Sequence, residues 1–394
     1  MTTDRMHEAA RETDLNVDYV AQRAAHPVHW DSERQLWRVT GYAEVSAALR
    51  DRRLSARRPV PNRSGLPTAA QALLGPIDGC FASWLVFREP PDHMPLRHAC
   101  AEAMTPFPAD DLAARIQSKI DQLLDATPQD EPFDLIRSFA YPLPVMNICE
   151  IFGIPGADLS RISAWLQSIV RGFGTGNGYV AAARSYTEMS AYLVAWIEKQ
   201  RSASKPDALL EACDSGSLRQ DEAVANYVFL LLAGHDTTTN MIGNGVLTLL
   251  QHPVELARLR ADASLLPAAI EELLRFESPV QEVRRTVAES LTLGGCTLET
   301  GQAVLLSIGA ANRDPAMFDQ PNHLRLDRRP NPHLAFIAGV HQCLGTHLAR
   351  LEARLVFSTL LRRFGSLELA EPEVHWTASE SVRGLERLMV RGRS

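Results

Sequence analysis

Residues 336–350 (FIAGVHQCLGTHLAR) constrain this chain most, because they place one cysteine between glycines immediately before a helical pattern. The pattern consists of leucines three or four residues apart: Leu344, Leu348, Leu351 and Leu355. Cys343 is therefore expected in a tight turn that leads into the first turn of a helix. Backbone N–H groups there have no partner within the helix, and the helix dipole favours negative charge. Both effects favour a thiolate, the form of cysteine that binds metal.

A lone cysteine in an apolar setting is more often an inert core residue than a ligand, but the residues around this one favour a ligand. Phe336, Gly339, His341, Cys343 and Gly345 fit the pattern F-x-x-G-x-H-x-C-x-G, which resembles the haem-ligand loop of the cytochrome P450 family. The resemblance implies that Cys343 is the proximal thiolate ligand of the iron in haem b. It also implies that Phe336 packs over the sulfur, that His341 lies near a propionate, and that both glycines contact the cofactor.

A long helix is predicted for residues 221–252, and its middle is unusually polar. Gly234 costs about 1 kcal/mol relative to alanine there, and Asp236 is followed by a run of threonines. The Thr237 hydroxyl can bond to the carbonyl of Ala233, which would open and bend the helix. Alone, such a stripe is more often a polar helix interface. However, A-G-H-D-T-T resembles the family's oxygen-activation motif, which implies that Asp236 and Thr237 are catalytic and that Ala233 lies beside the haem.

Three cations elsewhere are candidates for binding the haem propionates. His93 and Arg97 are four residues apart, so they share one face of a predicted helix. By itself this spacing usually marks a surface pair, but after Pro90-Pro91 it resembles the H-x-x-x-R helix of the cytochrome P450 family. Arg285 lies where the family has a further arginine that binds a propionate. The resemblance therefore implies that all three contact the cofactor.

Two positions depart from the family pattern. Glu272 and Arg275 fit its buried E-x-x-R ion pair, but His323 replaces the arginine that usually partners this pair, which predicts a weaker cluster. Ile337 stands where many bacterial members carry glycine, which predicts a different loop geometry or a different shielding of the thiolate.

Length and composition bound the fold and the location. At 394 residues the chain is long enough for two or three domains, but no low-complexity linker divides it. Because the resemblance covers nearly the whole chain, residues 1–394 are expected to form one haem-thiolate domain, mainly helical with small β-sheets. A net charge of −7 argues against a general nucleic-acid binder. No signal peptide or membrane-spanning run is visible, and the cysteines are scattered without a disulfide framework, so a cytoplasmic protein without membrane attachment is expected.

The resemblance implies a monooxygenase that inserts one oxygen atom from O₂ into a small organic substrate. Because the chain carries no flavin or iron–sulfur motif, electrons are expected from NAD(P)H through a reductase and a ferredoxin. Two alternatives are a peroxide-driven haem oxidase and a haem protein that binds or senses a gas without oxidising anything. The Asp236–Thr237 pair argues against both, because neither needs protons delivered to bound dioxygen.

The sequence gives only a rough guide to the substrate and the electron donor. The substrate is either free or tethered to a carrier protein, and the side chains expected to contact it are Ile169, Val170, Phe173, Val283, Ser381 and Val382. Several arginines between Arg50 and Arg63 form either a solvated loop or a basic surface for an acidic partner such as a ferredoxin.

Overall fold

The computed structural model describes residues 26–393, except 59, 129, 173–177, 204–206, 378 and 380, together with Val20 and Arg23. The chain divides into two compact units. We call residues 1–55, 113–143 and 236–394 the sheet unit, because all strands among the described residues lie there. We call residues 56–112 and 144–235 the helical unit. Each unit is described separately below.

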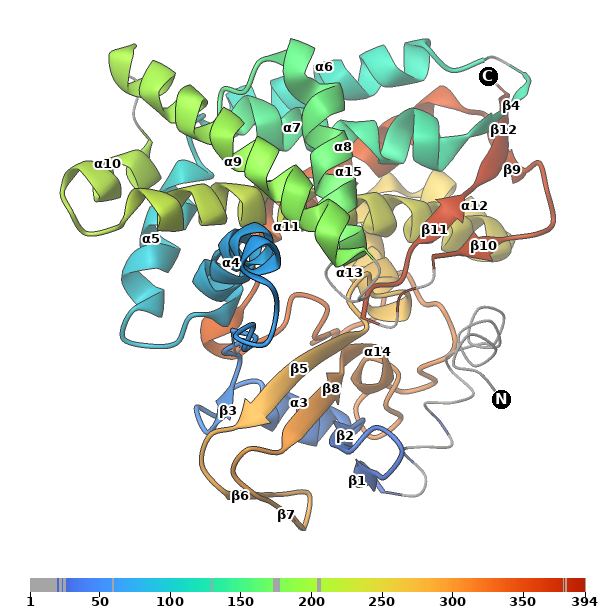
Figure 1. The fold of residues 1–394 in the computed structure, drawn as a ribbon. Coiled ribbons are helices and arrows are strands. Elements are labelled where there is room, and N and C mark those ends of the chain that lie inside the picture. Colours follow the sequence, from blue (N-terminus) through green and yellow to red (C-terminus); the bar gives the residue numbers. More distant parts are fainter. Residues whose placement is uncertain are drawn as a thin grey trace. The chain divides into compact units, whose positions relative to one another are not determined.

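The main sheet of the sheet unit has five strands in the order β1-β2-β8-β5-β3 (Figure 1). Its strands are β1 (Val28–Asp31), β2 (Leu36–Val39), β3 (Leu54–Ser55), β5 (Glu282–Val287) and β8 (Ala303–Ser307). Val28 is paired with Val39 across the β1–β2 hairpin, whereas β2 and β8 run parallel. Helices α3 (Tyr42–Ala48) and α14 (Ile308–Ala311) pack against each other and against strands β8 and β5. Apolar side chains from these elements form one buried core that reaches Leu334 and Ala338.

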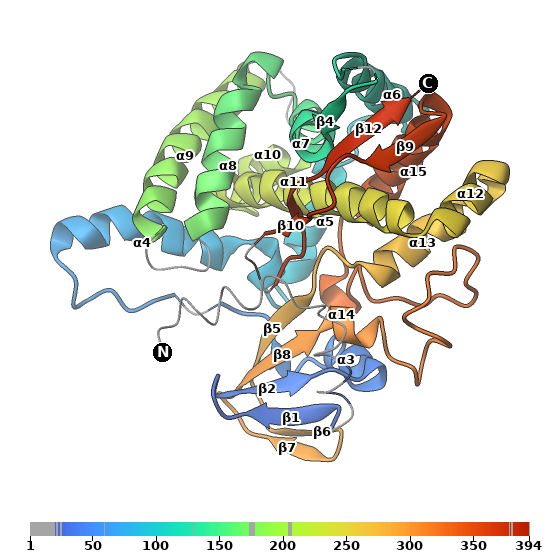
Figure 2. The same ribbon diagram turned by 90° about the vertical axis from the view of Figure 1, so that its right-hand side faces the viewer.

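Smaller sheets complete this unit (Figure 2). They are the hairpin of β6 (Leu291–Leu293) with β7 (Cys296–Leu298), the pair of β10 (His375–Trp376) with β11 (Leu385–Arg387), and the sheet of β4 (Pro132–Asp134), β12 (Met389–Arg393) and β9 (Ser366–Leu369). The longer helices are α6 (Ala109–Asp125), α12 (Pro253–Ala261), α13 (Leu266–Phe276) and α15 (Thr346–Arg363). Helices α13 and α15 pack together, which brings the segment after Cys343 against the E-x-x-R helix.

The helical unit is built around the pair α8 (Leu159–Gly172) and α9 (Tyr179–Ser202). Its other helices are α4 (Thr68–Ser83), α5 (His93–Ala103), α7 (Pro142–Ile151), α10 (Ala208–Asp214) and the first half of α11 (Gln220–Gln251). The buried Asn226 on α11 accepts a hydrogen bond from the Leu85 backbone N–H at 2.8 Å and donates one to the Ser83 carbonyl at 3.0 Å. This side chain thus ties the end of α4 to α11.

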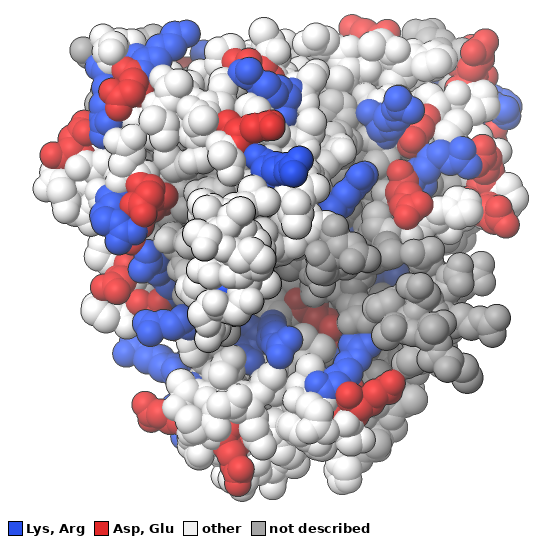
Figure 3. Space-filling model, viewed as in Figure 1, with Lys and Arg blue, Asp and Glu red and all other residues white. Residues whose placement is uncertain are grey.

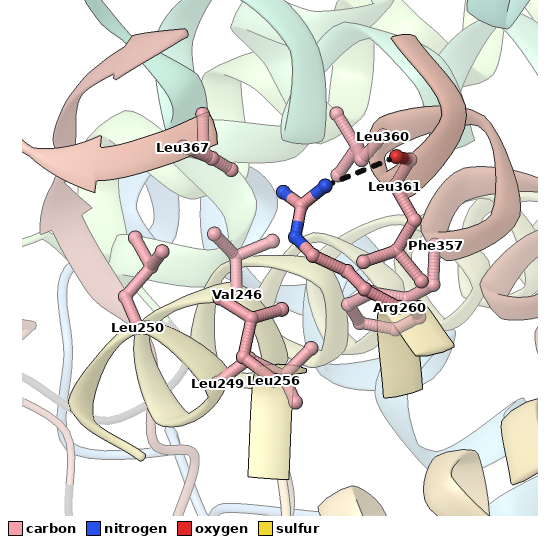
Figure 4. Close-up of a pocket in the computed structure, with 9 residues that line it drawn as sticks. All are labelled: Val246, Leu249, Leu250, Leu256, Arg260, Phe357, Leu360, Leu361 and Leu367. Atoms are coloured by element: carbon pink, nitrogen blue, oxygen red, sulfur yellow. Dashed lines mark hydrogen bonds between the residues drawn. The ribbon is translucent and has the colours of Figure 1, made fainter. Parts of the chain in front are cut away.

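A small apolar pocket lies in the sheet unit, where the end of α11 meets α12, α15 and β9 (Figure 4). Leu249 and Phe357 line it, and Arg260 donates to the Leu361 carbonyl at 3.2 Å. Its cavity volume of about 20 Å³ leaves room for about one water molecule. This pocket is therefore too small for an organic substrate. Among the described residues, no helix is both long enough and apolar enough to cross a membrane.

Candidate active site

The loop that carries Cys343 is held by its own backbone. The Cys343 N–H donates to the Phe336 carbonyl at 2.9 Å, and the Gln342 N–H donates to the Gly339 carbonyl at 3.1 Å. Gly339 has a φ of 77°, and a Cβ atom there would lie 2.5 Å from the Leu49 carbonyl oxygen. Both the conformation and the close backbone contact therefore require glycine at this position.

Ile337 keeps a conformation that suits glycine. Its φ is 59°, which is rare for a β-branched residue and typically costs about 1–3 kcal/mol. The Ile337 N–H donates to the Leu334 carbonyl at 2.7 Å, and the part-buried side chain packs against the core of the sheet unit. The loop therefore keeps the backbone conformation that is typical of glycine at this position, and Ile337 adopts it under strain.

Cys343 is exposed at the start of α15, which begins at Thr346 as the leucine pattern predicts. The Thr346 hydroxyl donates to the Cys343 carbonyl at 2.7 Å. The other five cysteines are buried or part-buried. Burial raises the pKa of the thiols of Cys80, Cys100 and Cys149 to about 12, so these thiols stay protonated at neutral pH. Cys343 is thus the most accessible of the six cysteines, and its place just before a helix N-terminus favours the thiolate form.

The polar middle of α11 lies within a continuous helix. Helical structure runs unbroken through Gly234–Thr239, so the opening expected at Thr237 is not present as a break in the helix. Thr238 and Thr239 are 4% and 6% exposed, whereas Asp236 and Thr237 are only part-buried. Ala233 is also part-buried, one turn before Thr237. Within this motif, Thr237 is thus more accessible than either of the two threonines that follow it.

The second half of α11 also anchors the C-terminal turn. The Asn244 side chain donates to the Arg383 carbonyl at 3.0 Å. A Cβ atom on Gly384 would lie 1.9 Å from Oδ1 of Asn240, so any larger residue there would displace the Asn240 side chain. Asp236, Asn240 and Asn244 are spaced four residues apart and form a polar stripe along the helix. Our sequence interpretation missed the two asparagines, although this spacing was the signal that could have found them.

The C-terminal turn lies beside the start of β5. Candidate substrate contacts that are distant in the sequence therefore lie close together here. The Gln281 N–H donates to the Ser381 carbonyl at 2.9 Å, and Val382 pairs with Val280. Val283, a further substrate candidate, lies on β5 and is part-buried. Ser381 and Val382 lie in the segment between the paired strands β10 and β11.

The remaining haem-binding candidates of the sheet unit are His341 and Arg285. His341 is part-buried in the short helical turn Gly339–His341. Arg285 is buried on β5, where its guanidinium donates to the Arg284 carbonyl at 2.9 Å. Gly345 immediately precedes the first residue of α15. Their contacts with a haem stay predictions.

The helical unit holds the other candidates. His93 is buried at the first position of α5, and Arg97 follows one turn later, as the spacing predicts. Ile169 is buried and Val170 part-buried near the end of α8. Phe173 lies outside the described residues. The approach of these residues to the cofactor or substrate stays a prediction.

The E-x-x-R cluster is complete, contrary to the expectation from His323. Arg275 donates to both carboxylate oxygens of Glu272, at 2.7 and 2.8 Å. The third member is Arg328, whose Nε lies 3.0 Å from each of these oxygens. The His323 side chain is exposed, and only its carbonyl takes part, accepting a bond from Arg328 at 3.1 Å. The arginine therefore comes from a position five residues further along, which local spacing did not reveal.

Similarity to known proteins extends over most of the chain. The model of the family "Cytochrome P450" matches residues 187–381. The chain is 36% identical over 384 residues to the biotin biosynthesis cytochrome P450 of Bacillus subtilis, covering 94% of each chain. It is 36% identical over 387 residues to the vitamin D(3) 25-hydroxylase of Pseudonocardia autotrophica, covering 94% of this chain and 92% of the relative.

A solved structure extends the similarity to the fold. It is that of P450BioI in complex with an acyl carrier protein ligated to hexadec-9Z-enoic acid, with a TM-score of 0.90 and 34% identity. The alignment covers 96% of this chain and 99% of that one. The prediction of a mainly helical fold with small sheets is thereby confirmed. The chain belongs to the cytochrome P450 family of monooxygenases, and its cofactor is haem b.

Proposed function

We propose that this chain inserts one oxygen atom from O₂ into a small organic molecule of secondary metabolism, by hydroxylation or epoxidation. Electrons come from NAD(P)H through a ferredoxin reductase and a ferredoxin, and the protein acts in the cytoplasm. The observation that carries the proposal is the loop that places Cys343 immediately before α15, with its conformation fixed by backbone hydrogen bonds and by Gly339. Bound haem supplies the activation of O₂, and a thiolate ligand favours cleavage of the O–O bond.

The residues of the chain divide this work. Cys343 would hold the iron, and the cations His93, Arg97, Arg285 and His341 would hold the propionates. The Thr237 hydroxyl would hold a proton at its Oγ1, and the Asp236 carboxylate would pass protons to that hydroxyl from solvent. A positioned acid–base pair of this kind contributes roughly 10²–10⁴-fold in rate. The part-burial of both side chains supports this role, because a proton relay must reach both solvent and the reacting oxygen.

Thr237→Ala tests the proton relay, with Thr238→Ala as its matched control. The Thr237 variant should bind substrate and consume NAD(P)H, but release much of the oxygen as peroxide instead of product. The buried Thr238 is a neighbour of the same type, so its variant should keep the wild-type product yield per NAD(P)H. If the Thr238 variant lost coupling and the Thr237 variant kept it, the assignment would be wrong.

Cys343→His tests the metal ligand. The variant should still take up haem but lose the thiolate-type spectrum of the reduced carbonyl complex. Cys296→Ser is the control, because Cys296 belongs to the same unit and is only part-buried. Retention of the thiolate spectrum in the Cys343 variant would assign the iron to another cysteine.

Turnover with different oxidants separates this proposal from the two alternatives. A monooxygenase should form product with NAD(P)H, reductase and ferredoxin, whereas a peroxide-driven oxidase needs peroxide alone. A gas-binding haem protein should form product under neither condition. The test measures product formation by the wild-type protein with each oxidant. Reactions without substrate control for uncoupled NAD(P)H consumption.

The substrate is proposed to lie against Ile169, Val170, Phe173, Val283, Ser381 and Val382. Two similar proteins guide the choice of probes, because one is named for vitamin D(3) and the other was solved with a carrier-bound acyl chain. A sterol, a free fatty acid and the same acyl chain on a carrier protein should therefore be titrated while the haem absorption band is recorded. A shift with the carrier-bound chain alone would identify a tethered substrate.

The basic stretch that could receive a ferredoxin is smaller than the sequence suggests. Arg53 forms a bidentate pair with Asp51, and Arg63 pairs with the buried Asp78. The guanidinium of Arg58 lies 4.9 Å from the ring centre of Phe81. On the face drawn in Figure 3, basic side chains are interspersed with acidic ones. A ferredoxin remains the proposed donor, and its docking surface is proposed to include the arginines of this stretch.

A further inference from the structure

Arg350 on α15 is held in one orientation by two contacts. Its Nε donates to one carboxylate oxygen of Glu271 at 2.7 Å, and its Nη2 donates to the other at 2.6 Å. Its guanidinium carbon lies 4.7 Å from the ring centre of Phe336, within the range of a cation–π contact. A bidentate pair and an aromatic face together fix the plane of the guanidinium. Lysine could supply the charge here but not this geometry.

Glu271 is itself fixed by the segment that precedes the ligand loop. The Ala335 N–H donates to Nδ1 of His333 at 3.2 Å, so the proton of this ring lies on Nε2. Nε2 then donates to Glu271 at 2.9 Å. Burial alone would raise the pKa of the Glu271 carboxyl, but the hydrogen bonds from Arg350 and His333 outweigh it and lower the pKa to about 2. This carboxylate therefore stays charged at neutral pH.

The same residues reach Cys343 through Phe336. Phe336 contacts Arg350 with its ring and accepts the Cys343 N–H with its carbonyl. The hydrogen bonds to Glu271 are the main cause that raises the pKa of Arg350, and the charge on Cys343 adds to it. A continuous set of contacts thus runs from His333 through Glu271, Arg350 and Phe336 to the backbone N–H of Cys343. The roles proposed above for the site residues involve neither the charge of Arg350 nor this set of contacts.

We propose that Arg350 is a positioning residue that holds the Phe336 ring at the Cys343 sulfur and sets the reduction potential of the haem through its fixed positive charge. The inference rests on Cys343 being the iron ligand, as proposed above. Reduction adds one negative charge to the iron centre, and a nearby cation stabilises that charge. Removal of the Arg350 charge should therefore make the haem harder to reduce. Glu271 and His333 act through Arg350 by keeping it in place.

The test measures the midpoint potential of the haem-loaded enzyme in a mediator titration without ferredoxin. Arg350→Gln should shift this potential to a more negative value and change the carbonyl-complex spectrum, because the ring loses its support. Arg354→Gln is the matched control: Arg354 is exposed on the same helix, one turn further on, and should leave both readouts unchanged. Arg350→Lys keeps the charge and should give a clearly smaller shift than the Gln variant.

Several outcomes would overturn the inference. A midpoint potential in Arg350→Gln equal to that of the wild type would show that the Arg350 charge does not set the potential. A potential unchanged in the titration, combined with slower and less salt-dependent reduction by ferredoxin, would make Arg350 a docking residue instead. If Arg350→Gln does not retain haem, Arg350→Lys alone tests the inference. A large negative shift of the midpoint potential in Arg350→Lys, which keeps the charge, would count against it. Failure of Cys343→His to lose the thiolate spectrum would instead refute the proposed ligand, so the two failures are distinguishable.

Discussion

Two consecutive glutamates on α13 anchor two charge clusters that differ mainly in their access to water. The Glu272 and Arg275 side chains are both 0% exposed, and that of Arg328 is 4% exposed. The Glu271 side chain is 27% exposed and that of Arg350 is 41% exposed. The chemistry is the same, a carboxylate held by guanidinium groups. Exposed pairs contribute little because water competes for both partners, whereas loss of one partner from a buried pair leaves an uncompensated charge.

The clusters also hold different segments. In the Glu272 cluster, Arg275 donates to the carbonyls of Asn312 and Pro321, and Arg328 donates to the carbonyl of Asp319. The Glu272 cluster thus fixes the irregular segment that precedes the Cys343 loop. The Glu271 cluster instead holds Phe336, whose carbonyl accepts the Cys343 N–H. The two neighbouring glutamates therefore hold different segments, a buried one beside Glu272 and the proposed ligand loop beside Glu271.

The largest expected effect is that of Arg328→Ala. Its loss leaves the buried Glu272 with only one of its two arginine side chains, Arg275, which should lower the free energy of unfolding by about 3–5 kcal/mol. Chemical denaturation followed by circular dichroism measures this value. His323→Ala is the control, because the side chain of His323 is exposed, and it should cost less than about 1 kcal/mol. Equal losses in the two variants would contradict the assignment of Arg328 to the cluster.

Glu271→Gln should have a smaller effect that depends on pH. The pKa of Glu271 is lowered to about 2 in the folded chain, against about 4.3 when unfolded. Its contribution is therefore complete above the unfolded pKa and is lost as the pH falls towards the folded one. The variant should be less stable by about 1 kcal/mol at neutral pH, after allowance for solvent screening. This difference should shrink below about pH 4 in urea denaturation, and a constant difference would argue against an ionised Glu271.

Salt should separate the two clusters further. Exposed charges are screened on raising the salt from about 0.1 M to about 1 M, whereas buried ones are screened much less. The cost of Glu271→Gln should fall by roughly 0.5 kcal/mol over this range. The cost of Arg328→Ala should stay the same. Equal salt dependence in the two variants would mean that burial does not distinguish the clusters.

Ile337→Gly should have the smallest net effect. The substitution relieves a positive φ that typically costs about 1–3 kcal/mol, but it removes a part-buried side chain and adds flexibility to the unfolded chain. These contributions nearly cancel, so the free energy of unfolding should change by less than about 1 kcal/mol. Val340→Gly, in the same loop without a positive φ, gains no such relief and should cost more. A larger loss for Ile337→Gly would show that packing of the Ile337 side chain contributes more than its backbone strain costs.

Local patterns predicted the parts of the site that lie close together in the sequence. The leucine spacing placed the start of α15, and the apolar pattern placed α11 within one residue at each end, at Gln220 and Gln251. Arg328 and the set of contacts around Glu271 were not predicted, because their partners are distant in the sequence. Glu271 and Arg350 are separated by 79 residues, and no spacing rule joins them. Such pairs depend on how helices pack, which one sequence does not reveal.

The exposure of Cys343 has a consequence for how the enzyme is assembled. Exposed thiolates oxidise first, and oxidation beyond sulfenic acid is irreversible for ordinary thiols. In a newly made chain, the most accessible of the six thiols is therefore the one proposed to bind iron. Under that proposal, a chain oxidised to this extent before haem insertion could not bind the cofactor through Cys343. The ligand assignment thus predicts that oxidants present before haem insertion lower the yield of working enzyme.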